Sequence, residues 1–431
     1  MTQFATPARF HLSREAGAIA PPDLLPQPLT EEQLLHLAER SLHQQLPPPH
    51  VALQACVIIP AKDEALALPA TLAALAAQTT LTGQALPAGM LEVIVLANNC
   101  SDCTAAVVRQ AARRHPNLVV HVAEISLPRP QAHVGRARRL LLDEAARRLE
   151  ATVGPTGVLL STDADTLVAS TWLAANLHEI EAGAEAVGGR ILTQAASSPE
   201  PCPVRRIQLR DAAYRVLLRQ LEDQVDPAPT DRWPCHHQHF GASLALTVRA
   251  YHQVGGLPAV PFLEDESLWQ LLLQHDLPVR HSPLVQVYTS ARRSGRVEVG
   301  LSWQLREWAS LHDCQQEPCV PCPHELVRVW RARRRLRAWW QQGARRAAGP
   351  ELARLAQALE VPVGALWQQA GVATAFGQLW CWVEQARGAV LPVPLSGALR
   401  EVRAYLHQGA ATHHGGRLPH HTVLKRAKAM A

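Results

Sequence analysis

From residue 51 onward the chain alternates short apolar runs with helical segments, and this alternation restricts the fold more than any other feature. Strands are predicted at 55–59, 93–96, 118–122 and 158–161, and helices at 66–77, 104–114 and 135–149. Short buried strands separated by helices of about 10 to 15 residues are typical of a mainly parallel sheet with helices on both faces. The pattern therefore predicts an α/β fold.

Polar segments follow three of these strands. They are residues 60–64, 98–102 and 163–165. Ligands of open α/β sheets bind beyond the carboxyl ends of the strands, where all three segments are expected to lie. Their convergence predicts a binding site at this edge of the sheet.

The most specific of these segments is Asp163-Ala164-Asp165. Two carboxylates spaced i, i+2 at the end of a buried strand can face one cleft, and their oxygens suit Mg²⁺ or Mn²⁺. An ion held there would neutralise a diphosphate, as a sugar-nucleotide-dependent enzyme requires. The alternative is a pair of surface aspartates in an ordinary β–α turn, where Asp is common.

Four regions are predicted along the chain. Residues 1–50 form an extension with one helix, which Thr30 caps and Gln33 completes as a capping box. Residues 51–310 form the sheet domain, whose second part is less regular, with strands at 187–193, 241–248 and 285–289 and helices at 205–221 and 267–275. A helical, Arg-rich region follows at 311–412, and residues 413–431 are expected to be a flexible tail.

Composition narrows the functional class. Apolar content of 47% and charged content of 18% are those of a soluble globular protein. The sequence has no apolar stretch of membrane-spanning length and no pattern of a secretory signal, so a cytoplasmic location is expected. The net charge of +5 is carried almost wholly by Arg and does not suggest a nucleic-acid partner, and the nine cysteines are expected to be reduced thiols.

Six motifs in order resemble glycosyltransferase family 2, the inverting enzymes with the GT-A fold. They cover about 51–310 and are Val57-Ile58-Ile59-Pro60-Ala61-Lys62-Asp63-Glu64, Ala97-Asn98-Asn99-Cys100-Ser101-Asp102-Cys103-Thr104, Gly135-Arg136-Ala137-Arg138, Asp163-Ala164-Asp165, Gly255-Gly256-Leu257 and Glu264-Asp265. The resemblance implies a GT-A sheet flanked by helices, with a helical C-terminal extension. It also implies a metal-dependent transfer of a sugar from a nucleoside-diphosphate sugar to a hydroxyl acceptor.

The resemblance assigns the donor site residue by residue. Asp165 would bind Mg²⁺ or Mn²⁺, and a group of residues from the three strand ends would contact the donor: Pro60, Ala61, Glu64, Asn98, Asn99, Asp102, Arg138 and Asp163. Asn98-Asn99 stands where the family often has acidic residues, and this departure leaves the nucleobase undetermined. Arg138 is the basic residue expected near the diphosphate, since Arg suits bidentate phosphate contacts.

Asp265 is the expected general base, with Glu264 beside it as a substrate-binding residue. In an inverting transfer, a carboxylate accepts the proton of the acceptor hydroxyl while a metal stabilises charge on the leaving phosphate. Asp265 opens the predicted helix at 267–275, where a helix dipole tolerates a carboxylate. The structural alternative is that Glu264 or Asp265 simply caps this helix.

The basic loop at 290–296 contributes Arg292 and Arg296 as a candidate phosphate or acceptor clamp, with a solvated basic loop as the alternative. Processive relatives carry a Gln-x-x-Arg-Trp motif at about this distance. Here the segment at 304–308 reads Gln-Leu-Arg-Glu-Trp, with Arg one place early and no membrane spans after it. These differences predict a single transfer rather than polymerisation.

Three other clusters have competing interpretations. The basic, Trp-bearing helix at 326–346 suits either an anionic membrane surface or packing on the catalytic domain, and packing is favoured. The histidines at 236, 237 and 239 are candidate lining of an acceptor pocket, and Trp233 is a candidate for sugar stacking or for the core, with the core favoured. The set Cys314, Cys319, Cys322 and His324 has metal-like spacing, but a Pro-rich setting favours free thiols.

Two functions compete with the transferase. One is an inactive GT-A-like module that binds nucleotides or acts as a scaffold on an anionic surface. The carboxylates at 165 and 265 count against it. The other is nucleotidyl transfer, which usually requires a glycine-rich loop after the first strand, and residues 60–65 contain no glycine.

Overall fold

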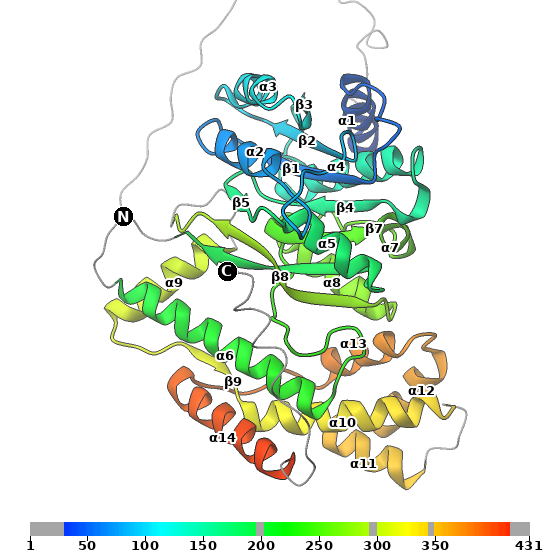
Figure 1. Cartoon of the computed structure of the whole chain (residues 1–431). Helices are drawn as coiled ribbons and strands as arrows, with labels where there is room; N and C mark the ends of the chain where they lie inside the picture. The colour runs from blue at the N-terminus through cyan, green and yellow to red at the C-terminus, as the bar shows by residue number, and fades with distance from the viewer. Residues whose placement is uncertain (1–29, 195–201, 293–299, 344–348, 414–431) are drawn as a thin grey trace, which may run out of the picture.

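The computed structural model describes residues 30–194, 202–292, 300–343 and 349–413. Its centre is an eight-stranded sheet with the strand order β3-β2-β1-β4-β7-β6-β8-β5 (Figure 1). The strands are β1 (Ala55–Ala61), β2 (Leu91–Asn98), β3 (Val119–Ile125), β4 (Val158–Ser161), β5 (Thr166–Val168), β6 (Ala186–Thr193), β7 (Leu244–Thr247) and β8 (Val279–Thr289).

The sheet is mixed and mostly parallel. Strands β1 to β4 pair in parallel, and β6 pairs with β8 in the same way. Strand β7 lies antiparallel between β4 and β6, and β5 lies antiparallel to β8 at the edge. The predicted α/β class and mainly parallel sheet are therefore confirmed. The carboxyl ends of β1, β2 and β4 share one edge, as expected.

Helices cover both faces of the sheet. One buried cluster joins it to α1 (Glu31–Gln45), α4 (Val134–Glu150), α7 (Val248–Gln253) and α8 (Glu264–Gln274). A second cluster on the other face joins it to α2 (Leu68–Ala76), α3 (Thr104–Arg114) and α5 (Trp172–Glu181). Strand β2 is buried along its whole length, as a strand covered on both faces must be.

A helical region lies below the sheet in Figure 1. It contains α6 (Pro203–Val225), α9 (Leu301–Asp313), α10 (Pro323–Gln341), α11 (Pro350–Leu359), α12 (Val363–Val372), α13 (Phe376–Ala386) and α14 (Leu395–His413). Two short strands, β9 (Cys319–Pro321) before α10 and β10 (Pro392–Pro394) before α14, pair in antiparallel orientation within this region. The Arg-rich helix α10 buries Val327, Trp330, Leu336 and Trp339 against these neighbours. The favoured packing interpretation is confirmed in part, because α6 belongs to the predicted catalytic domain whereas α11 to α14 belong to the C-terminal helical region.

No helix in the described ranges is both long and apolar enough to cross a bilayer. At the other end of the chain, Thr30 caps α1: its hydroxyl accepts the Gln33 N–H at 3.2 Å, and the Gln33 side chain accepts the Thr30 N–H at 2.8 Å. The predicted capping box is thus confirmed.

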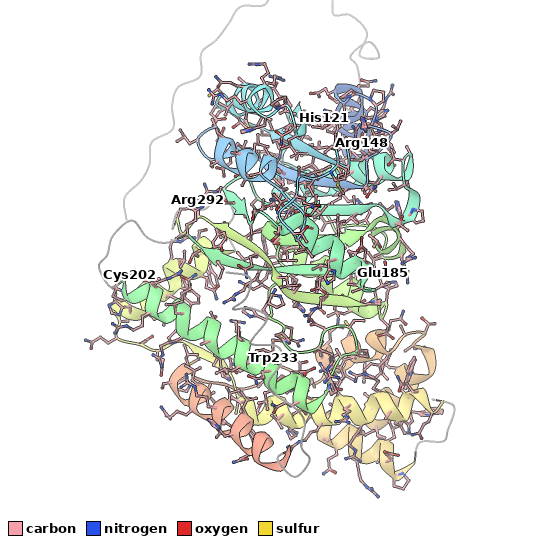
Figure 2. The ribbon with its side chains drawn as sticks, viewed as in Figure 1. His121, Arg148, Glu185, Cys202, Trp233 and Arg292 are labelled. Atoms are coloured by element: carbon pink, nitrogen blue, oxygen red, sulfur yellow. The ribbon has the colours of Figure 1, made fainter. Side chains whose placement is uncertain are left out.

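Other expectations need correction or stay untested. Trp233 is 37% exposed next to α6, not in the core (Figure 2). Among the described residues, the Cys/His set at 314–324 does not gather as a metal site, and His324 instead bonds Tyr405. The predicted strand at 241–248 is a short 3-10 turn (Gly241–Ser243) followed by β7. Apart from residue 413, which ends α14, the tail lies outside the described residues.

Candidate active site

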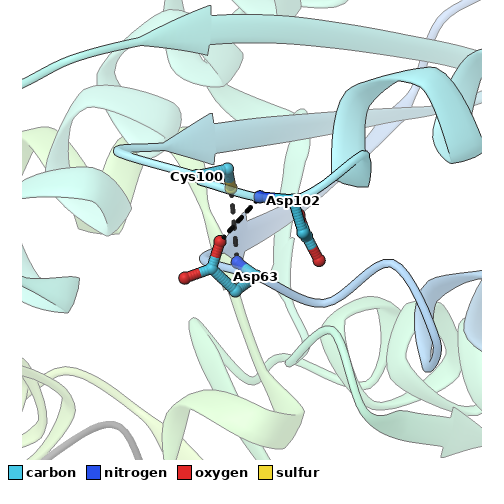
Figure 3. A group of neighbouring side chains, drawn as sticks. All are labelled: Asp63, Cys100 and Asp102. Atoms are coloured by element: carbon cyan, nitrogen blue, oxygen red, sulfur yellow. Dashed lines mark hydrogen bonds between the residues drawn. The ribbon is translucent and has the colours of Figure 1, made fainter.

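The loops after β1 and β2 are hydrogen-bonded to each other. Asp63 Oδ1 accepts the Ser101 N–H at 2.6 Å and the Asp102 N–H at 3.2 Å, and the Asp63 N–H donates to Cys100 Sγ at 3.3 Å. Figure 3 shows the bonds of Asp63 to Asp102 and to Cys100. Asp102 Oδ2 accepts the Ala65 N–H at 3.1 Å, and its Oδ1 accepts from Thr104. The bonds that the Asp63 carboxylate accepts, led by the one from the Ser101 N–H, lower the pKa of Asp63. Through its own bonds to Ala65 and Thr104, Asp102 joins the loop after β1 to the loop after β2.

The two asparagines at the end of β2 have different environments. Asn99 is committed to the protein: its Nδ2 donates to the Leu127 carbonyl and its Oδ1 accepts the Leu127 N–H, both at 2.9 Å. Asn98 is 5% exposed, and its Oδ1 has no hydrogen-bond partner among the described residues. A buried acceptor without a partner is costly, so Asn98 is the better candidate for a ligand contact.

Arg138 joins the predicted motifs at the centre of the site. It is 3% exposed, and its Nε donates to Glu264 at 3.0 Å while Nη2 donates to Asp163 at 3.1 Å. Its Nη1 donates to Ser161 and to the Gly241 carbonyl. Because acceptors among the described residues take four of its five N–H groups, Arg138 holds the carboxylates together, and one N–H of Nη2 is left for a phosphate contact.

Two glycines make this arrangement possible. A Cβ on Gly241 would lie 2.4 Å from the Arg138 guanidinium carbon, and a Cβ on Gly135 would lie 1.9 Å from the Val260 carbonyl oxygen. Gly135 therefore lets the start of α4 approach the loop that precedes α8. This is the physical reason for glycine in the Gly-Arg-Ala-Arg motif.

The carboxylates that begin α8 have three different partners. Glu264 pairs with Arg138, and Glu266 lies 2.7 Å from His239 Nε2. Asp265 accepts the Gly241 N–H at 2.7 Å and the Glu266 N–H at 2.8 Å, and no described side chain donates to it. The helix begins at Glu264 and not at 267, and its N-cap is Leu263 without a side-chain cap, so the capping alternative is wrong.

Asp165 and Glu64 lie on the other side of Asp163. Arg292 Nη2 is 2.8 Å from Glu64 Oε1 and 3.2 Å from Asp165 Oδ2, and Figure 2 places Arg292 where β8 ends. Burial, together with the negative charges of Asp163 and Glu64, raises the pKa of Asp165 to about 6 despite Arg292. The carboxylates around Asp165 therefore carry more negative charge than the neighbouring arginines compensate.

The remaining predicted residues are less informative. Pro60 and Ala61 end β1 and pair with Leu96 and Ala97, at the same edge as the carboxylates. Arg296 lies outside the described residues. Sequence reasoning missed Ser161 and Gly241 as acceptors of Arg138, because hydroxyls and backbone carbonyls carry no specific signal. It also missed the link from His239 to Glu266.

The histidine segment before β7 is buried more deeply than residues that line an open pocket. His236 is 3% exposed and bonds the Ser282 carbonyl at 3.0 Å. Burial lowers the pKa of His236 to about 3 and that of His237 to about 2. Both rings are therefore neutral, and His236 does not line an acceptor pocket.

Comparison with known proteins finds a family match within the sheet domain. Residues 56–233 match the family model described as Glycosyl transferase family 2. The match contains the strand-end motifs up to Asp165, together with Arg138, and ends before Asp265. No curated protein matches the chain.

Several solved structures are distantly similar. A mannosyltransferase from Pyrobaculum calidifontis, in complex with GDP-Man and Mn²⁺, is 17% identical with a TM-score of 0.40, over 89% of this chain and 88% of that one. S. aureus TarS 1-349, in complex with UDP-GlcNAc, is 13% identical with a TM-score of 0.38, over 77% and 90%. M. tuberculosis glucosyl-3-phosphoglycerate synthase is 14% identical with a TM-score of 0.34, over 68% and 89%. These scores are too low for any of the three to identify a substrate.

Proposed function

This chain is a glycosyltransferase family 2 enzyme, and we propose that it transfers one sugar from a nucleoside-diphosphate sugar to a hydroxyl acceptor, with inversion and with a divalent cation. The observation that carries this proposal is the convergence of Asp163, Arg138 and Glu264-Asp265. One buried guanidinium bonds both acidic motifs, which are about 100 residues apart in the sequence.

The residues fit Mg²⁺ or Mn²⁺. Asp165 has carboxylate oxygens, the preferred ligands of these ions, and its pKa is raised by burial and by the charges of Asp163 and Glu64. Added positive charge would relieve this crowding. When bound, the cation would supply charge stabilisation for the departing nucleoside diphosphate.

Asp265 would act as the general base. Arg138 neutralises Glu264 and His239 engages Glu266, whereas Asp265 is held by two backbone N–H groups. Each of its oxygens accepts one such bond and keeps a lone pair, so it can still accept a proton. The backbone bonds fix its orientation, as a base that must reach one acceptor hydroxyl requires.

Arg292 would bind the donor diphosphate. Its guanidinium lies between Glu64 and Asp165, and its side chain is 34% exposed, so an incoming diphosphate can replace one carboxylate as its partner. Pro60, Ala61, Asn98 and Asp102 border the nucleoside side of the same edge, where the Asn98 Oδ1 acceptor is unfilled among the described residues. Arg296 remains a proposed acceptor-side residue.

A turnover assay tests this function. The protein is incubated with UDP-, GDP- and dTDP-sugars, with and without Mn²⁺, and release of nucleoside diphosphate is measured. At least one sugar nucleotide should be hydrolysed or transferred only with the cation, and Asp265→Asn should abolish that release. Full release by this variant would refute the assignment of the base. Binding without any release would favour an inactive nucleotide-binding module.

A further inference from the structure

A chain of four side chains connects the start of α8 with the protein interior. Glu266 Oε2 lies 2.7 Å from His239 Nε2, and His239 Nδ1 lies 3.2 Å from His281 Nε2. His281 Nδ1 lies 2.6 Å from Asp231 Oδ2. All three distances are those of hydrogen bonds, and we call this set the relay.

The number of protons in the relay can be counted. Each of the three bonds needs one proton between its two atoms. Two neutral imidazoles supply two protons, and ionised carboxylates supply none. The relay therefore holds one proton more than the neutral rings provide, carried either by an imidazolium or by a carboxylic acid.

Both carboxylates favour the ionised form. The bond from His239 is the main cause that lowers the pKa of Glu266. Burial raises the pKa of Asp231, but the bond from His281 and the charge of Arg219 outweigh it and hold this pKa well below its usual range. The extra proton is thus on one of the two rings.

Of the two rings, His239 is the better place for the charge. Burial lowers the pKa of His281 despite its bond to Asp231, which favours a neutral His281 with its proton on Nδ1. The ring of His239 stacks on Trp269, with centroids 4.6 Å apart and planes at 6°. A cation on an indole face is favourable, and Glu266 accepts from the second nitrogen.

We propose that His239 is an imidazolium in the resting protein, and that it is a positioning residue which neutralises Glu266 and so leaves Asp265 as the carboxylate that accepts the substrate proton. The first half of this proposal concerns a protonation state. The second half rests on the proposed transferase function.

A pH dependence follows from the groups that face His239. Glu266 from α8, His281 from β8 and His237 from its own loop act on His239 directly. Arg219 from α6 and Arg280 from β8 pair with Asp231 at the other end of the relay, and His236 packs on His281. When the extra proton leaves at alkaline pH, the remaining proton of the His239 ring stays on Nε2, bonded to the Glu266 carboxylate, and the bond from Nδ1 to His281 is lost. Glu266 then keeps its hydrogen-bond donors, His239 and Gln270, but loses the positive charge that neutralises it, and activity should fall.

Nitrogen-15 NMR of histidine-labelled protein tests the protonation state without substrate. The two ring-nitrogen signals that disappear in His239→Gln belong to His239. At about pH 7.5 these signals should be those of a ring protonated on both nitrogens, and His281 should give the signals of a neutral ring with its proton on Nδ1. Glu266→Gln should convert His239 to the neutral form at the same pH. A neutral His239 in the wild-type protein would overturn the proposal, whether or not the protein turns over sugar nucleotides.

Kinetics then test the positioning role. His239→Gln should lower kcat by on the order of tenfold or more and remove the alkaline decline of the pH profile, with the donor KM nearly unchanged. His252→Gln is the matched control, because His252 pairs with Glu150 at 2.9 Å on the surface and belongs to no such chain. If His239→Gln kept the alkaline decline of the wild-type pH profile while NMR showed the expected protonation state, the positioning role would be refuted and the protonation state would stand.

Discussion

At the residue scale, the carboxylates of the site differ in how far neighbouring cations compensate their negative charge. Arg138 pairs with Glu264 and Asp163, whereas Asp165 is partly buried beside Asp163 and Glu64, and its pKa rises to about 6 despite its pair with Arg292. An ionised carboxylate in that position opposes folding, and such strain is common where a protein must bind a cation.

Asp165→Asn should stabilise the metal-free protein. A rise of the pKa from 3.8 to about 6 corresponds to on the order of 3 kcal/mol at neutral pH. Because the folded pKa is raised, the group's favourable contribution is complete below the unfolded pKa and is lost as pH rises through about 6. The Tm in EDTA should therefore exceed that of wild type at neutral pH, and the gap should shrink as pH falls below 6. A lower Tm for this variant would contradict the account.

Arg138→Met should destabilise the protein severely. It leaves Glu264 buried without its cation and removes the donors to Asp163 and Gly241. Breaking a buried ion pair by removing one partner costs about 3–5 kcal/mol. Arg136→Met, whose Nε bonds Gln131, is the control and should cost far less. Urea unfolding of both variants measures the difference, and equal midpoints would refute the central role of Arg138.

At the element scale, charged side chains attach α10 to α6. Asp226, which follows α6, is buried and accepts from Arg333 Nε at 2.5 Å and Arg337 Nη1 at 2.6 Å. Arg333 also reaches Glu222 on α6 at 2.6 Å. Two arginines of the predicted basic helix are therefore used inside the protein, as the packing interpretation requires.

Asp226→Ala should loosen this attachment. Two arginines lose a buried acceptor, so a loss of about 3–5 kcal/mol is expected, seen as a lower midpoint in urea and faster proteolysis near α10. Asp223→Ala, which removes a pair with the exposed Arg232, should change the midpoint by less than about 1 kcal/mol. Similar effects of the two variants would show that Asp226 does not hold these helices together.

Elements whose signals are local were predictable from the sequence. The capping box of Thr30 and Gln33 lies within one turn, and the buried strands β1, β2 and β4 are continuous apolar runs. The start of α8 was not predictable, because acidic residues before a helix resemble caps whereas Leu263 occupies that position with φ of 57°. Element type thus follows from local pattern, and exact boundaries follow from tertiary contacts.

At the scale of the whole molecule, the parallel sheet was predictable and the contacts across it were not. Alternation of strands and helices, with ligands at the carboxyl edge, brings the three strand-end motifs together in any such fold. The partners of Arg138 come from 23 to 126 positions away, and His239 meets His281 across 42 positions. No short-range pattern encodes these contacts, so the site's residues could be named from sequence but their partners could not.

In the proposed function, Asp165 binds the cation that receives the donor's diphosphate. Another acidic group, Asp63 with Cys100 and Asp102, is the alternative place for an ion. Titration calorimetry of Mn²⁺, with a nucleoside diphosphate present, compares them directly. Asp165→Ala should weaken Mn²⁺ binding by tenfold or more, on the order of 1.4 kcal/mol, while Asp63→Asn keeps wild-type affinity. Unchanged binding by Asp165→Ala, with loss in Asp63→Asn, would contradict the account.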